Sequence, residues 1–173
     1  MQTGLEYIRP LMKAGNKKLL ISFVAVILLG CLYFAIFSFS EQDGETSGSL
    51  SYMISEKCVE LLNVFSGKHW TRDFRESLAA YFEHPIRKLA HFAEYACMGV
   101  LVSVLLSQWM QKKKSRYLLT TLWVFLSAAA DEIHQLFVPG RYGSFADVCL
   151  DTCGGIFGML FLACVLNIFR KHF

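Results

Sequence analysis

The feature that most constrains this chain is an uninterrupted apolar run, because no residue from Leu19 to Ser40 carries a charge. A helix rises ~1.5 Å per residue, so it needs about 20 apolar residues to cross the ~30 Å hydrocarbon core of a bilayer. Three further stretches, at 88–108, 117–138 and 145–169, have similar length and apolar character. The sequence therefore predicts an all-α integral membrane protein, a bundle of four transmembrane helices.

Basic residues indicate how these spans are oriented. They precede the first span, occupy the segment Lys112–Arg116 and follow the last span at Arg170. Lys and Arg favour the cytoplasmic side of a membrane. We therefore predict cytoplasmic N- and C-termini, with 1–18 as a cytoplasmic segment and 19–173 as the membrane domain. Alternation of the spans then places the loop 41–87 and the turn 139–144 outside.

The long outer loop 41–87 has its own apolar pattern. Apolar residues recur at helical spacing over 50–65 and again over 74–82, which predicts two short amphipathic helices on the outer membrane surface. Three features mark their expected boundaries: a linker at Gly44–Ser51, a break at Gly67 and a helix restart at Pro85. The pattern leaves open whether these helices cover a site or only decorate the surface.

Ionisable residues interrupt the last three spans near their predicted outer ends. Counted from the nearest basic cluster, Glu94, Asp131 and Asp151 lie ~27, ~22 and ~28 Å along their helices, respectively. Residues three, four or seven apart share a helix face, so each span presents its polar side chains together. We predict a pocket that opens outward and contains Lys88, His91, Glu94, Asp131, Glu132, His134, Gln135, Arg141, Asp147 and Asp151.

A simpler interpretation is that each acidic residue pairs with Arg87, Lys88 or Arg141 and only ties helix ends together. That interpretation suits a lone ion pair. Charges within spans usually face protein or water and are often functional, so a cluster of this size favours a ligand or catalytic site.

The motifs that carry these residues resemble the VanZ-like membrane proteins of bacteria. They are Arg87-Lys88-Leu89-Ala90-His91-Phe92-Ala93-Glu94-Tyr95, then Asp131-Glu132-Ile133-His134-Gln135 through Arg141, then Asp147 through Gly155. Ser38, Ser40 and Gln42 resemble that family's serine-glutamine motif, although Glu41 stands where a second serine is common. The likeness covers all four predicted spans.

The resemblance implies a multi-pass protein of the bacterial cell membrane, and some family members are associated with low-level resistance to teicoplanin. It marks as functional Lys88, His91, Glu94, Asp131, Glu132, Gln135, Arg141 and Asp147. The resemblance also makes Ser38, Ser40 and Gln42 ligand-binding candidates. They join His134 and Asp151, which belong to the predicted pocket. It supplies no reaction, so the catalytic assignment stays a hypothesis.

Three classes of function remain open. An enzyme could act on a lipid-linked or peptidoglycan-related substrate, with Lys88 and Arg141 holding an anion. Glu94 or His91 would then be the base and Asp131 or Glu132 the acid. A non-catalytic protein could instead bind a lipid or an antibiotic in the same pocket. A proton-coupled transporter is less favoured, because the chain lacks the repeated halves of that class.

The expected partners are membrane lipids and a lipid-linked cell-wall substrate or glycopeptide. Nucleic acid is not expected, because the basic residues form short clusters beside apolar runs. No cofactor is predicted, and metal binding ranks below proton chemistry because no HExxH motif occurs. We expect a role in envelope homeostasis or glycopeptide tolerance.

Overall fold

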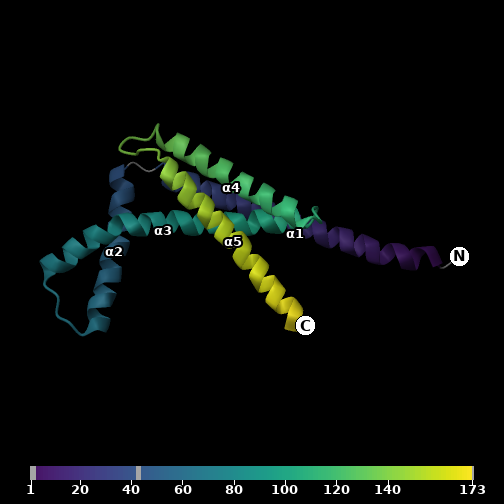
Figure 1. Cartoon of the computed structure of the whole chain (residues 1–173), viewed down its shortest axis with the longest axis horizontal. Helices are drawn as coiled ribbons and strands as arrows, with labels where there is room; N and C mark the ends of the chain where they lie inside the picture. Colours follow the sequence, from purple (N-terminus) through teal and green to yellow (C-terminus); the bar gives the residue numbers. More distant parts are fainter. Residues whose placement is uncertain (1–2, 42–43, 173) are drawn as a thin grey trace.

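The computed structural model describes the backbone of residues 3–41 and 44–172 and the side chains of residues 15–41 and 48–171. These residues form α1 (Thr3–Ser40), α2 (Gly44–Ser66), α3 (Arg72–Ser107), α4 (Lys113–Gln135) and α5 (Phe145–His172). α3 runs through the middle and contacts the other four helices. Figure 1 shows α2 against its N-terminal half and α5 crossing it. The all-α prediction is confirmed.

Three helices in the described part of the chain are long and apolar enough to cross a membrane. They are Gly15–Ser40, Arg72–Ser107 and Phe145–Lys171, so the chain is a multi-pass membrane protein. α4, the predicted third span, does not reach that composition. Lys113, Lys114 and Arg116 lie in its first turn, and Asp131, Glu132 and His134 lie in its last two turns. Four spans are therefore not established by composition.

Several helix boundaries differ from the sequence prediction. Gly44–Ser51 is not a linker but lies within α2. The predicted short helix at 74–82 and the second span are one continuous helix, α3, which begins after the N-cap Thr71. Pro85 lies inside α3 rather than at a helix start. Its ring removes one backbone hydrogen bond, and this is tolerated because both Pro85 and Tyr81, four residues earlier, are exposed.

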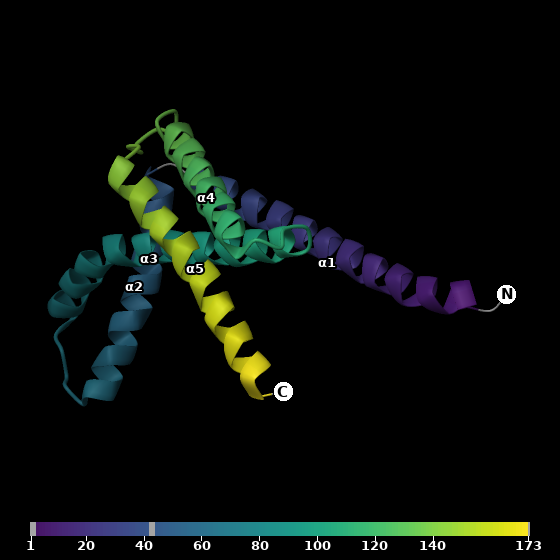
Figure 2. The same cartoon turned by 45° about the vertical axis from the view of Figure 1, so that its right-hand side comes forward.

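Other boundary predictions agree with the structure or shift slightly. Gly67 ends α2 with a φ of 62°, a conformation that favours glycine, so the predicted break is confirmed. α1 continues through Leu19 without interruption. Figure 2 shows its N-terminal part extending away from the other helices. The predicted division at residues 18 and 19 stays a prediction.

The core lies where α1, α3, α4 and α5 meet. Its buried side chains come from all four helices: Leu29, Ile36, Tyr95, Met98, Val102, Val124, Ala128 and Val148. Large apolar side chains are also exposed on the outside, including Phe34 on α1, Leu118 on α4 and Phe161 on α5. Such a surface suits a lipid environment.

Glycines bring the backbones of α3 and α5 into direct contact. A Cβ atom at Gly158 would collide with the carbonyl group of Ala96, and one at Gly154 with that of Phe92. The four-residue spacing of these glycines is typical of close helix pairs in membranes. The predicted close approach on the last span is confirmed. This crossing fixes the positions of the polar residues farther along α3 and at the start of α5.

Candidate functional site

A polar cavity of about 290 Å³ lies at the end of the bundle where α5 begins. Side chains of α3, α4, α5 and the loop between α4 and α5 line it. These lining residues include most of the predicted cluster: Lys88, His91, Glu132, Gln135, Arg141, Asp147 and Asp151. Three of the four predicted spans therefore meet at this cavity, as their helical depths predicted.

The loop between α4 and α5 is folded back onto α4. The backbone N–H of Ser144 donates to Oε2 of Glu132 at 2.7 Å, and a Cβ atom at Gly143 would collide with the Glu132 carbonyl. Gly140, with a φ of 71°, completes the turn that precedes Arg141. This loop geometry holds Arg141 at the edge of the cavity.

Lys88 and Asp147 form the ion pair that closes one side of the cavity. The Nζ of Lys88 lies 2.6 Å from Oδ1 of Asp147, and both side chains are partly exposed. The pair joins α3 to the first turn of α5. Arg87, the neighbouring cation, pairs instead with Glu83 on its own helix. The simpler interpretation, in which acidic residues only pair with cations between helices, therefore holds for Asp147. This pair does not account for the other acidic residues of the cluster.

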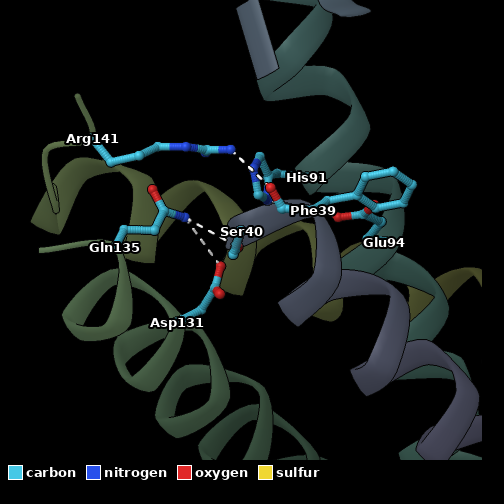
Figure 3. Close-up of polar contacts among 7 residues, drawn as sticks. All are labelled: Phe39, Ser40, His91, Glu94, Asp131, Gln135 and Arg141. Carbon is cyan, nitrogen blue, oxygen red and sulfur yellow. Dashed lines mark hydrogen bonds and ion pairs between the residues drawn. The ribbon is translucent and has the colours of Figure 1, made fainter. Parts of the chain in front are cut away.

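The end of α1 contributes a buried hydroxyl to the site. Nε2 of Gln135 donates to Oδ2 of Asp131 at 3.2 Å and to the Ser40 hydroxyl at 3.4 Å. Nη2 of Arg141 donates to the carbonyl oxygen of Phe39 at 2.9 Å. Figure 3 shows these contacts converging from α1, α4 and the α4–α5 loop. They tie the first helix to the polar cluster.

Several buried polar atoms in the cluster have no hydrogen-bond partner among the described residues. They include both carboxyl oxygens of Asp151 and Oδ1 of Asp131. The side chains of Asp131 and Asp151 are 0% and 1% exposed, respectively. Buried polar atoms in folded proteins are almost always paired with protein or water. Asp151 lines the cavity, whereas Asp131 does not line it but accepts a hydrogen bond from Gln135, which does.

His91 and Glu94 form a loose pair on α3. Nδ1 of His91 lies 3.7 Å from Oε2 of Glu94, which exceeds hydrogen-bonding distance. Both atoms are buried and lack hydrogen-bond partners within the described part of the chain. A small shift of either side chain would bring this acid–base group and the carboxylate into direct hydrogen-bonding distance.

Among the described candidates, Ser38, Ser40 and His134 do not line the cavity, and neither do Glu94 and Asp131. The side chain of Ser38 is exposed. The ring of His134 packs edge-on against Phe37, with 5.7 Å between ring centres, and does not line the cavity. Gln42 lies outside the described residues. Ser40 differs from Ser38 because it is two positions farther along α1 and faces the bundle.

The structure adds lining residues that the sequence reasoning missed, His84 and Tyr142 among them. His84 lies seven residues before His91, and two helical turns place both on one face of α3, so this spacing could have identified it. Tyr142 belongs to the loop, where periodicity gives no such signal. Ser144 acts through its backbone N–H, which no sequence pattern marks.

The described residues offer no obvious metal centre. No group of three or more His, Cys, Asp or Glu side chains among them is arranged to hold a metal ion. The six cysteines are free and exposed, and none lines the cavity. The chemistry available in the cavity is therefore that of carboxylates, imidazoles and cationic side chains.

Comparison with known families agrees with these motifs. The VanZ/LLP1 family profile matches residues 24–168. The chain belongs to the VanZ/LLP1 family. The match includes every residue that lines the cavity, and it confirms the predicted resemblance. No curated protein and no solved structure matched this VanZ/LLP1 chain.

Proposed function

We propose that this VanZ/LLP1 protein crosses the bacterial membrane four times, with both termini in the cytoplasm and the cavity at the outer leaflet. The distribution of basic residues supports this orientation. Exposed Leu118, Leu122 and Leu126 give α4 the apolar surface that a lipid-facing helix needs. Because Asp131, Glu132 and Gln135 are buried, the polar residues of α4 need not face lipid.

Reporter fusions test this orientation directly. Green fluorescent protein fused after Phe173 should fluoresce, whereas alkaline phosphatase fused there should be inactive. Alkaline phosphatase inserted after Tyr142 should be active, because it folds only outside the cytoplasm. Active phosphatase at the C-terminus, or inactive phosphatase after Tyr142 in a stably inserted protein, would contradict the proposed orientation.

The cavity binds the anionic group of a lipid-linked or peptidoglycan-related envelope molecule. Lys88 and Arg141 reach it from α3 and from the α4–α5 loop. Their partners include the Asp147 carboxylate and the Phe39 carbonyl, respectively, which are acceptors that an anionic ligand can replace. Phosphate and carboxylate groups suit such cations, and Arg141 can contact two oxygens at once.

The same cavity supports proton transfer on the bound molecule. His91 lines the cavity, and Glu94 lies behind it at 3.7 Å. In this proposal His91 or Glu94 accepts a proton, while Asp131 or Glu132 donates one. The observation that carries the proposal is that cationic side chains line one open cavity together with His91 and Asp151, two groups with buried polar atoms that lack hydrogen-bond partners among the described residues.

The proposed biological role is envelope homeostasis or tolerance of glycopeptides such as teicoplanin. Teicoplanin sensitivity of a deletion strain, complemented with variants of this chain, tests that role. Lys88→Met, Glu94→Gln and Asp131→Asn should each fail to restore tolerance at wild-type protein levels. Ser38→Ala, at an exposed position near the same end of α1, is the matched control. Full complementation by both Glu94→Gln and Asp131→Asn would rule out the proton chemistry.

A non-catalytic binding function is the second candidate. It is favoured by the 3.7 Å gap between His91 and Glu94, which leaves the pair without a direct hydrogen bond. In that case Glu94→Gln would retain function, whereas Lys88→Met would abolish it. The same complementation experiment therefore separates the two candidates.

A further inference from the structure

A second, smaller cavity of about 170 Å³ lies between α2 and α3. It differs from the polar cavity because half of its lining residues are apolar. The apolar contributors come from the end of α1, from α2 and from α3: Phe39, Leu50, Ile54, Ile86 and Ala90. A surface of this kind favours hydrocarbon over a hydrated group.

The two cavities are neighbours that share three side chains. Arg87, His91 and Arg141 line both of them. Glu94 lines only the apolar cavity, where its Oε2 is buried and lacks a partner within the described part of the chain. Two cations and a histidine therefore stand at the junction between a polar and an apolar compartment. Figure 3 shows His91, Glu94 and Phe39 close together at this junction.

We propose, on the basis of the proposed function, that the substrate is an amphiphile held across this junction. Its anionic group occupies the polar cavity, and the first carbons of its hydrocarbon chain enter between α2 and α3. Leu50 and Ile54 of α2 contact that chain and are specificity-determining residues. The substrate is accordingly lipid-linked, and a soluble peptidoglycan fragment would fill only half of the site.

The position of α2 supports this assignment. Ser55, one residue beyond Ile54, is buried and donates to the carbonyl oxygen of Ala79 at 2.6 Å, which fixes α2 against α3. Leu50 and Ile54 themselves are 38% and 43% exposed, so their apolar surfaces are incompletely covered by protein. A hydrocarbon chain in the cavity would cover them further.

A larger apolar groove is a less suitable place for this chain. The groove has a volume of about 540 Å³ and runs between α1 and α4, where Tyr33, Trp123 and Leu126 line it. It shares no lining residue with the polar cavity. Continuity with the anion-binding cations therefore favours the cavity beneath α2, and Leu126 supplies a matched control position.

Binding calorimetry on the purified full-length protein in lipid nanodiscs tests the proposal, with empty nanodiscs as the baseline. The probes are methyl phosphate and hexyl phosphate, which share an anionic group and differ in hydrocarbon. Hexyl phosphate should bind at least about tenfold more tightly, because each buried methylene strengthens binding several-fold. In Ile54→Trp and Leu50→Trp this advantage should fall to about threefold or less, while methyl phosphate binds as in the wild type. Leu126→Trp should leave both affinities unchanged.

Each alternative result of this binding experiment would contradict a different part of the proposal. Equal binding of the two phosphates by the wild type would refute the apolar subsite but leave the anion site standing. Loss of the hexyl advantage in Leu126→Trp, and not in Ile54→Trp, would place the chain in the groove between α1 and α4. Absence of binding by either phosphate would refute the anion site of the proposed function, and the subsite with it. Methyl phosphate binding also verifies that each tryptophan variant is folded.

Discussion

The α3–α5 crossing and the polar cavity beside it are built in opposite ways. At the crossing, Gly154 and Gly158 let the backbone of α5 lie directly against that of α3. In the cavity, side chains of four elements surround an open space, and the buried carboxyl oxygens of Asp151 lack partners among the described residues. The first arrangement contributes stability, whereas the second costs stability and supplies reactive groups.

This difference predicts which substitutions should affect folding and which should affect function. Close-packed contacts have no room for an added side chain, so substitutions there act through folding. Unpartnered buried groups can often be replaced with a gain in stability and a loss of function. Five substitutions test this contrast, beginning with the largest expected effect.

Gly158→Leu should prevent folding of the membrane domain. The new side chain would meet the Ala96 carbonyl, which belongs to a helix backbone and cannot move aside. The measurement is the yield of monodisperse protein by size-exclusion chromatography in detergent. Gly30→Leu on α1 is the control, because a Cβ atom there meets nothing within 4 Å. A monodisperse Gly158→Leu variant with wild-type thermal stability would show that the crossing is looser than described.

Asp151→Asn and Asp147→Asn should change stability in opposite directions, although they lie one turn apart on α5. Asp151 is buried and its carboxyl oxygens lack partners among the described residues, so replacing the carboxyl group should stabilise the protein by about 1 kcal/mol. Asp147 pairs with Lys88, so its neutralisation should lower the melting temperature. Thermal unfolding in one detergent measures both. Destabilisation by Asp151→Asn would mean that this carboxylate has a stabilising partner, such as water.

Ser55→Ala should weaken the attachment of α2 by about 1 kcal/mol, because it removes the buried hydrogen bond to the Ala79 carbonyl. Thermal unfolding gives the overall effect, and protease sensitivity between Ser66 and Arg72 reports local release of α2. Ser66→Ala is the control, because that hydroxyl bonds only within its exposed helix end. Equal effects of the two substitutions would indicate that α2 is held by apolar packing alone.

Arg72→Ala should have no measurable effect on melting temperature. Its ion pair with Glu76 is exposed, and exposed pairs of this kind contribute little. A clear destabilisation would indicate that the charged cluster at the start of α3 takes part in a larger network. This variant also serves as a baseline for the other four.

Much of the fold could be read from the sequence because it depends on local properties. Hydropathy along the chain identified the apolar helices, and the rise per residue placed Glu94, Asp131 and Asp151 at a common level. The spacing of Gly154 and Gly158 indicated a close helix contact. Lys88, His91, Glu132, Gln135, Arg141 and Asp147 were all predicted, and all line one cavity.

Other features depended on how the helices are rotated and where they cross. Only the tertiary structure decided that α3 continues through Pro85 and that Ser40, but not Ser38, faces the bundle. It also decided that Asp147 is paired with Lys88, while the buried Asp151 has no partner within the part of the chain that the structure describes. Spacing fixes which residues share a face of one helix, but the partner opposite that face is set by packing between helices far apart in sequence.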